Sequence, residues 1–507
     1  MGTGNSPHIV SIHILDDDSL LNIFYLYRPF FLGEGGNDTW HLYGGKEQWV
    51  QGRWWYRLTH VCQRWRNLIL ASASYLRLSL VCTNGMPVES MLAHSPLLPL
   101  TVDYSSEDGI AAEDEEVILF ALQQRDRVRH LRLTFPVQNL RKLVMAIDEE
   151  FPILEYLIVH PLAEDSTALM LPERLQAPHL RHLALSGFVC PIRPRLHPAA
   201  TAASLVTLYL AINHASAYFP PNILLQWISF MPQLESLAIY FAFPVPNRDV
   251  ERQLTRTPIT TQITLPNFRL FWFGGVSAYL EAVVCRITAP CLENLQIRLF
   301  QQLTFSISRL VQFMNTTENI RFDDAGIVFK DKRINVLMSF LEADTNSFIV
   351  TVDCWHLDWQ VSSVAQISNA LSQVFSSVEY LTLRHEVHGQ SSEEHNDVDR
   401  ILWRKLLVLF SNVKTLDIDE GLIEELSRCL QLEDGELPLE LLPELQELRY
   451  TGSGEAGGAF TPFIDARQNA GRPVTLTLVR GVRPSNPSSE PPAITPESGE
   501  AGNDTET

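Results

Sequence analysis

The sequence predicts an α/β protein in which a small all-α domain precedes an irregular solenoid, or horseshoe, of alternating short strands and helices. Two short amphipathic helices are predicted near the N-terminus. A phrase with apolar residues at positions k, k+3 and k+5 then recurs through most of the 507-residue chain. Helix signals lie between the copies of the phrase, and this alternation in a short period is typical of a solenoid.

The first predicted helix lies within residues 14–30. Asp16 supplies an N-terminal cap, and Pro29 ends the helix. One apolar stripe is formed by Leu20, Ile23, Phe24 and Tyr27. Leu21 and Leu26 lie off this stripe and add apolar surface that two isolated helices cannot bury, so we expect a partner. The alternative is that the helices simply cap the rest of the protein.

The second predicted helix lies within residues 57–80. Its apolar residues follow the spacing of one helical face: Leu58, Val61, Cys62, Trp65 and Ile69. Residues 57–66 read RLTHVCQRWR, and with residues 20–24 this segment resembles the F-box proteins that are abundant in fungi. Residues 91–95 and 99–102 resemble the sequence that follows the box in that family. An insert at residues 33–52 splits the box.

The resemblance implies that the box binds a Skp-type adaptor and, through it, a cullin scaffold. The chain is then the substrate-recognition subunit of an SCF-type ubiquitin ligase. Candidate residues of the box, facing either the adaptor or its own core, are Leu15, Leu20, Leu21, Ile23, Phe24, Leu58, Val61, Cys62 and Trp65. We assign residues 1–74 to the F-box domain, 75–481 to a leucine-rich-repeat-like domain, and the Pro-, Ser-, Gly- and Glu-rich residues 482–507 to a disordered tail.

The repeated phrase predicts one short strand per repeat, and starts recur at roughly 25 to 35 residues, the range of leucine-rich repeats. The clearest copies start at Val128, Leu154, Leu180, Leu205, Leu234, Leu292, Val378, Val413 and Leu445. Further copies are expected at residues 75–80, 97–102, 268–273 and 474–478. The interval after Leu292 leaves room for about two degenerate copies.

Helices are expected at residues 222–231, 305–314, 364–375, 398–410 and 422–430. A doubly wound α/β domain shows the same alternation of strands and helices. The recurring k, k+3, k+5 spacing favours the solenoid. Ordinary parallel strands are similar in composition but do not repeat one spacing of apolar residues.

In this phase, positions k+2, k+4 and k+6 lie on the face opposite the leucines, which is the concave face of a horseshoe. The residues there include Tyr156, His160, His182, Tyr209, Tyr240, Trp272, Gln296, Arg298, Tyr380, Arg384, Asp417 and Arg449. Tyr, Trp and Arg dominate binding hot spots. We therefore expect an unknown protein target to contact Tyr156, Tyr209, Tyr240, Trp272, Arg298, Tyr380 and Arg384. The alternative is that these side chains only fill space between strands.

The balance of 39 Lys and Arg against 59 Asp and Glu gives a net charge of −20, which argues against nucleic acid or an anionic membrane as partner. No apolar run has the length of a membrane span, and no signal peptide is expected. Seven cysteines without a Cys-x-x-Cys pair argue against a disulfide framework or a zinc site. They favour a reducing, intracellular location, in the cytoplasm, the nucleus or both.

Motifs for covalent chemistry are largely missing. Residues 452–457 fit Gly-x-Gly-x-x-Gly after a predicted strand, but the further strand–helix units that a dinucleotide domain needs do not follow. The histidines and glutamates of residues 385–395 do not have the spacing of a zinc protease, so a solvated loop is expected. We predict no enzyme activity, no cofactor and no metal. The main alternative is a repeat scaffold without a ubiquitin-ligase role, and an enzyme comes third.

Overall fold

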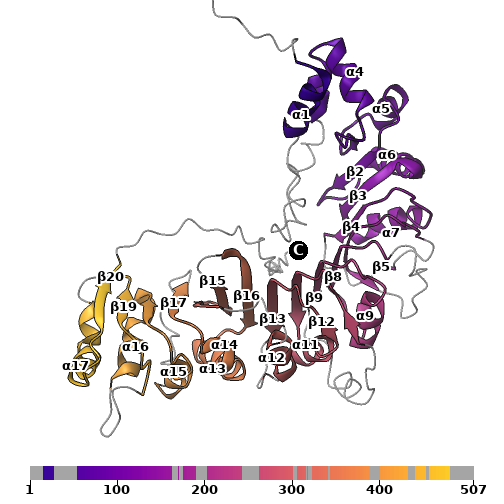
Figure 1. The fold of residues 1–507 in the computed structure, drawn as a ribbon. Helices are drawn as coiled ribbons and strands as arrows, with labels where there is room; N and C mark the ends of the chain where they lie inside the picture. The colour runs from indigo at the N-terminus through magenta and orange to yellow at the C-terminus, as the bar shows by residue number, and fades with distance from the viewer. Residues whose placement is uncertain are drawn as a thin grey trace, which may run out of the picture.

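The computed structural model describes residues 15–27, 54–162, 169–170, 175–189, 202–242, 262–300, 305, 307–315, 317, 322–340, 343–386, 400–431, 440–452 and 456–479. These residues form one curved sheet of 16 strands with helices along its outer side (Figure 1). The hydrophobic core lies between the sheet and the helices and continues along the whole array. The opposite face of the sheet is concave.

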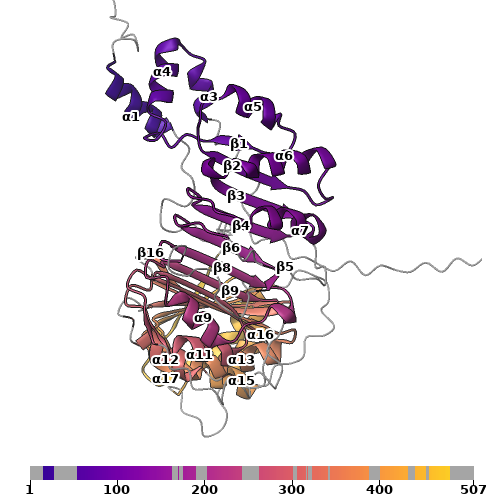
Figure 2. The same cartoon turned by 90° about the vertical axis from the view of Figure 1, so that its right-hand side faces the viewer.

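Nine parallel strands follow one another in sequence order in the first half of the sheet. They are β1 (Leu80–Cys82), β2 (Leu100–Ser105), β3 (Val128–Phe135), β4 (Tyr156–Pro161), β6 (His182–Ser186), β8 (Thr207–Ile212), β9 (Ser236–Phe241), β11 (Leu270–Gly275) and β13 (Asn294–Phe300). Figure 2 shows them stacked as a ladder. Because each strand pairs with its predecessor and its successor, this part is a solenoid. The doubly wound alternative is wrong, since its strand order would reverse.

The leucine phrase explains how each strand enters the sheet. In the repeat of β4, Leu154, Leu157 and Val159 are all buried in the core. The residue after the first leucine donates its amide to the preceding repeat, as Glu155 does to the Arg129 carbonyl at 2.8 Å. The same bond joins Arg269 to Glu235 and Glu293 to Arg269. This hydrogen bond fixes where each strand joins the sheet and therefore which of its residues face the core.

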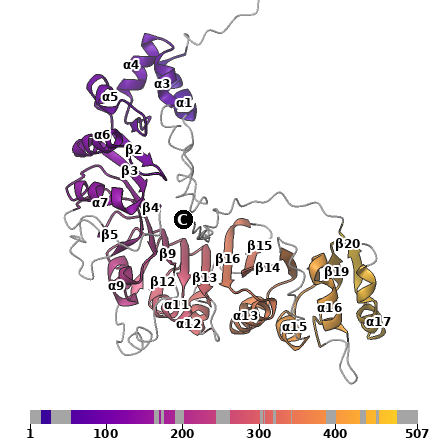
Figure 3. The same cartoon turned by 180° about the vertical axis from the view of Figure 1, so that it is seen from behind.

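The second half of the sheet departs from the expected repeat. Three strands occupy the interval after β13: β14 (Asp324–Lys330), β15 (Arg333–Phe340) and β16 (Ala343–Asp353). β14 and β16 both pair antiparallel with β15, and in space β16 lies beside β13 while β14 lies beside β17 (Figure 3). The prediction of two degenerate repeats is therefore wrong. Only Asp331 and Lys332 separate β14 from β15, which is too short for a crossover helix and imposes a hairpin.

The last four strands return to the parallel repeat. They are β17 (Tyr380–Glu386), β18 (Thr415–Ile418), β19 (Glu447–Tyr450) and β20 (Thr475–Leu478). The outer helices of the array are α5 (Val88–His94), α6 (Ala112–Gln123), α7 (Val137–Ala146), α9 (Pro221–Ile228), α11 (Ser277–Val284), α12 (Ser308–Asn315), α13 (Leu357–Ala370), α14 (Ser372–Phe375), α15 (Arg400–Leu407), α16 (Ile423–Leu430) and α17 (Thr461–Asn469). The five predicted helical segments are confirmed by α9, α12, α13 with α14, α15 and α16.

Short elements complete the described part of the chain. Two small sheets pair β5 (Leu169–Met170) with β7 (Phe188–Val189), and β10 (Ile263–Thr264) with β12 (Ile287–Thr288). Single 3₁₀ turns are η4 (Arg125–Arg127), η5 (Ala215–Ala217), η6 (Glu420–Leu422) and η7 (Ala456–Phe460).

The N-terminal helices are α1 (Asp17–Tyr27), α3 (Trp54–Thr59) and α4 (Gln63–Ala71), and they sit at the end of the sheet that begins with β1 (Figure 2). Phe24 contacts the edge of the Trp65 ring at 4.8 Å between centroids. Trp55 donates its indole N–H to the Ser79 carbonyl at 3.2 Å. Leu20 and Phe24 belong to the same continuous core as the strands. The N-terminal helices are therefore packed directly onto the solenoid.

Two predicted strand starts differ from the structure. Residues 75–79 do not form a strand: Arg77 has φ +48°, and β1 starts only at Leu80. Leu76 and Leu78 are nevertheless buried, because the turn directs them into the end of the core beneath the N-terminal helices. Leu97 is exposed, and the next strand starts at Leu100. The insert at 33–52 and the tail at 482–507 lie outside the described residues.

Candidate functional site

The concave face carries the predicted target residues. In β4, Leu157 and Val159 point into the core, whereas Tyr156, Ile158 and His160 alternate with them on the other face. Each of the twelve residues assigned to the concave face lies in a strand at such an alternate position. The predicted orientation is thus confirmed. Contact with a target stays a prediction.

Three rings form an aromatic patch in the middle of this face, which we define as Tyr209, Tyr240 and Trp272. Tyr209 and Trp272 are stacked at 6.1 Å between centroids with 8° between their planes. Tyr240 stacks on Trp272 at 5.5 Å and 15°. Ala238 lies between Tyr209 and Trp272 in the strand register. Its small, fully buried side chain lets the two rings lean together over β9.

Arg298 extends the aromatic patch toward β13. Its guanidinium carbon lies 5.7 Å from the centroid of the Tyr240 ring. Its Nε donates to Asp353 Oδ2 of the neighbouring β16 at 2.9 Å. Burial acts to lower the pKa of Arg298, but the hydrogen bond to Asp353 and the charges of Tyr240 and Asp353 together outweigh burial, so the pKa of Arg298 is raised. The cation is therefore held over the Tyr240 ring of the aromatic patch.

A second row of rings crosses the first strands. Tyr156 stacks on His182 at 4.1 Å and meets His130 edge-to-face at 4.6 Å. His130 Nδ1 lies 3.3 Å from Thr101 Oγ1. Burial lowers the pKa of His130 to about 3, and the charge of Arg129 adds to this effect. Burial likewise lowers the pKa of His182 to about 4. Both imidazoles are neutral at pH 7, which suits close stacking on Tyr156.

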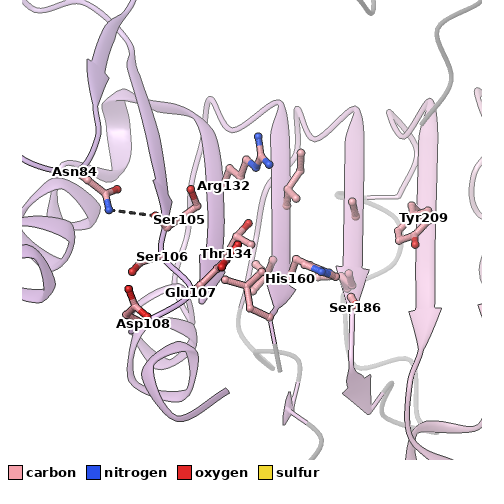
Figure 4. A pocket seen from close by; sticks show the side chains of 15 residues that line it. Asn84, Ser105, Ser106, Glu107, Asp108, Arg132, Thr134, His160, Ser186 and Tyr209 are labelled. Carbon is pink, nitrogen blue, oxygen red and sulfur yellow. Dashed lines mark hydrogen bonds between the residues drawn. The ribbon is translucent and has the colours of Figure 1, made fainter. Parts of the chain in front are cut away.

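A concavity of about 530 Å³ opens beside the aromatic patch, toward the carboxyl ends of β2 to β8 (Figure 4). Its floor includes Ile158, Ala184 and Tyr209. One row of polar side chains crosses it, formed by Ser105, Thr134, His160 and Ser186. Glu107 and Asp108 line it from the loop that follows β2.

Sequence reasoning missed most of this concavity. It singled out aromatic and arginine positions, so it included His160 and Tyr209 but passed over the small polar residues. The signal was present in the phrase, because Thr134 occupies position k+6 of its repeat, as His160 does in the next. No residue pattern predicted that Glu107 and Asp108 line the concavity, because the position of their loop depends on how β2 pairs with β3.

The remaining target residues are not brought to the aromatic patch. Tyr380 and Arg384 lie on β17, and three strands of the antiparallel insertion separate β17 from β13. This part of the concave face is polar: Arg449 donates to Glu447 at 2.8 Å, and burial raises the pKa of Asp417.

Within the aromatic patch, Tyr209 is only 7% exposed, so its ring is mainly a packing element beneath Trp272.

The structure divides the nine box residues into three groups: buried, exposed and partly exposed. Leu20 and Phe24 are buried in the core. Ile23 is 42% exposed and Val61 is 58% exposed. The side chains that are partly exposed are those of Leu15, Leu21, Leu58, Cys62 and Trp65. Three further exposed apolar residues of α1 were not among the nine: Tyr25, Leu26 at 72% and Tyr27.

Among the described residues, no three His, Cys, Asp or Glu side chains are grouped as metal ligands. No described helix is both long and apolar enough to span a bilayer. Gly452 of the glycine motif has φ +136° and lies against Glu420, while residues 453–455 and most of 385–395 fall outside the described ranges.

The repeating strand–helix units and their leucine phrase define an α/β solenoid of leucine-rich-repeat type. No protein-family model matches the chain, and no curated protein matches its sequence. Among solved structures, the leucine-rich repeat-containing protein LegL7 from Legionella pneumophila is similar at 12% sequence identity and a TM-score of 0.27. That match covers 73% of this chain and 99% of LegL7. A similarity this distant carries no argument about function.

Proposed function

We propose that this protein is the substrate-recognition subunit of an SCF-type ubiquitin ligase. Its N-terminal helices dock on a Skp-type adaptor, and through it on a cullin, while the concave face holds a protein target. The chain performs no covalent chemistry and uses no cofactor. Its contribution is proximity, because holding the target raises the effective concentration of its lysines near the charged conjugating enzyme. Such a complex operates in the cytoplasm, the nucleus or both.

The observation that carries the proposal is an apolar face on α1 that stays exposed within the described part of the chain. Ile23, Leu26 and Tyr27 follow the i, i+3, i+4 spacing of one helix face, and all three are exposed. Leu20 and Phe24, which adjoin this face on α1, are buried. Val61 is exposed in the turn between α3 and α4, inside the segment that resembles the F-box. An apolar face of this kind is a candidate for a protein partner.

The packing of the N-terminal helices supports the proposed proximity mechanism. α1 is tied to α4 by Arg64, whose Nη2 donates to Asp17 at 2.7 Å and to the Leu15 carbonyl at 2.7 Å. Tyr75 donates to Asn22 at 3.2 Å. Because the same helices share the core of the solenoid, an adaptor bound to them would have a fixed position relative to the concave face.

Co-purification of the full chain with the Skp-type adaptor tests the proposal. We expect one complex on gel filtration, and we expect Leu26→Asp and Val61→Asp each to prevent it without changing the thermal unfolding midpoint. Leu21→Asp, at a partly exposed position, should weaken it. Met145→Asp is the matched control, because Met145 is an exposed apolar residue on α7, outside the box. Absence of a complex with the unmodified chain would refute the ligase role.

That negative result would favour the other candidate, a repeat scaffold without a ubiquitin-ligase role. The aromatic patch on the concave face supports target binding independently of the box. Replacing Tyr209, Tyr240 and Trp272 together with Ala should abolish target capture while unfolding stays cooperative. If this variant captured the target at an unchanged level, the concave face would not be the target site, either in a ligase or in a scaffold.

A further inference from the structure

The concavity between β2 and β8 has the features of a binding site for an extended peptide. It is open to solvent along the concave face, and its lining changes character from one end to the other (Figure 4). Apolar residues line the part from β4 to β8, with Ile158 on β4, Ala184 on β6 and Tyr209 on β8. The β2 end is acidic, with Glu107 and Asp108 in the loop after the strand. A ligand that fits both ends is apolar at one point and cationic at another.

The middle of the concavity offers hydrogen-bonding groups that the fold does not use. Thr134 is only 8% exposed, yet within the described residues its hydroxyl makes no hydrogen bond. The hydroxyl borders the open volume, between Ser105 on β2 and His160 on β4. Solvent reaches this hydroxyl from the open side of the concavity, and a ligand can replace water as its hydrogen-bond partner. A peptide backbone crossing the strands would supply such a partner.

The charges around the concavity favour a cation at the acidic end. Glu107 and Asp108 are exposed, and neither forms an ion pair with another described residue. Arg132, the cation that lines the concavity, lies 3.9 Å from Asp103. Burial, together with Arg132, lowers the pKa of His160 to about 4, so this imidazole adds no positive charge at pH 7. The same two carboxylates repel phosphate groups, which disfavours nucleic acid and anionic lipid.

The strand spacing sets the length of the ligand. β2 and β8 are separated by β3, β4 and β6. With about 4.8 Å between neighbouring strands, the two ends lie about 19 Å apart. An extended chain advances about 3.3 Å per residue, so about six residues connect the ends. The strands cannot lend their own backbone groups, because these are engaged in the ladder, so side chains such as Thr134 must hold the peptide.

We propose that this concavity binds an extended segment of the target that carries a large apolar side chain and, about six residues away, a lysine or arginine. The apolar side chain lies on Ile158, Ala184 and Tyr209, next to the aromatic patch. The cation lies against Glu107 and Asp108. This inference rests on the proposed binding of a protein target by the concave face, and it specifies the chemistry of that target.

Fluorescence anisotropy with labelled synthetic peptides and the full chain tests the inference. The peptides share one composition of Gly and Ser with a single Leu and a single Arg, placed three, six or nine positions apart in both orders. We expect the tightest binding at a separation of six. Equal binding at all separations, tighter binding when Arg is replaced by Glu, or no binding at millimolar peptide would each overturn the inference.

Variants of the chain locate the bound peptide. Glu107→Gln with Asp108→Asn should weaken binding about three- to tenfold, and should have no further effect on a peptide whose Arg is replaced by Gln. Thr134→Val, which keeps the side-chain shape, should weaken binding about threefold or more. Glu113→Gln with Glu116→Gln on α6 is the matched control, since it removes two charges outside the concavity. Unchanged affinity in the first two variants would refute the site.

The same preparations keep this inference separate from the ligase proposal. Each chain is also applied to gel filtration with the Skp-type adaptor. A chain that binds the adaptor but no peptide refutes only the peptide site. A chain that binds the peptide but no adaptor refutes only the ligase role.

Discussion

The ring of Tyr240 in β9 occupies the space beside Gly274 in β11 that a side chain would fill. The two residues are partners in the strand register, and a Cβ atom added at Gly274 would overlap the Tyr240 ring. Gly274 therefore provides the space in which Tyr240 turns toward Trp272 and Arg298. The aromatic patch depends on a residue that has no side chain.

Gly274→Ala should push the Tyr240 ring away from Trp272. We expect a destabilisation of about 1 kcal/mol, because the ring can give way only by losing its stacking contacts. Chemical denaturation measures the cost, and a crystal structure of the variant shows the ring position. Gly326→Ala is the matched control, since Gly326 lies in β14 of the same sheet and an added Cβ meets nothing within 4 Å. Identical stability and Tyr240 position in the two variants would contradict this role of Gly274.

Phe24→Ala and Leu26→Ala should change stability by very different amounts, although the two residues are only two positions apart on α1. Phe24 is buried against Trp65, so its truncation leaves a cavity that costs about 3 to 5 kcal/mol within the N-terminal helices. Leu26 is exposed, so its truncation should change stability by less than about 0.5 kcal/mol. Hydrogen exchange of residues 15–27 measures both. Equal protection in both variants would mean that Phe24 is not a core residue.

Arg298 and Asp353 should be energetically coupled. Their ion pair links β13 to β16 at 2.9 Å, and both side chains remain partly exposed. Because solvent screens such a pair, we expect a coupling energy of about 0.5 to 1 kcal/mol in a double-mutant cycle of Arg298→Ala and Asp353→Ala. The coupling should decrease in high salt. Strictly additive effects of the two substitutions would show that the pair contributes nothing.

Acidification should destabilise the protein through its concave histidines. The pKa of His130 is about 3 when folded, mainly because of burial, whereas an unfolded histidine titrates near 6.5. The unfolded chain then binds the extra proton between these values, so this stabilising contribution is complete above about pH 6.5 and is lost as the pH falls toward 3. Chemical denaturation at pH 7.5 and pH 5 should show a smaller loss of stability for His130→Gln than for the unmodified chain.

His94→Gln serves as the control for that measurement, because it removes an exposed imidazole from α5. A loss of stability between pH 7.5 and pH 5 that is the same in His130→Gln and in the unmodified chain would rule out His130 as a cause.

Much of the fold was predictable because its determinants are local. The spacing of Leu154, Leu157 and Val159 fixes one strand and its buried face, and the same spacing recurs at Leu234, Leu237 and Ile239. Nearest-neighbour stacking then needs no further information, since each repeat contacts only the next. The alternation along a strand also placed Tyr240 and Trp272 correctly on the concave face.

The antiparallel insertion was not predictable in this way. Its strands carry an alternating apolar pattern, as in Ala325, Ile327 and Phe329, but that pattern does not say which neighbour a strand pairs with. β14 pairs with β17, and 49 residues, 331–379, lie between the two strands in sequence. Pairing over such a separation is decided by which sheet edges are open once the local repeats have formed.

By itself, the sequence determined the repeat, its phase and the face on which each strand side chain lies, because these follow from residue spacing along one short segment. The tertiary structure alone decided that Leu20 and Phe24 are covered while Leu26 is exposed, and that Tyr380 is set apart from the aromatic patch. It also brought Glu107 and Asp108 to the end of a row that runs through Thr134. These relationships join residues on different strands, so they exist only after the strands have paired.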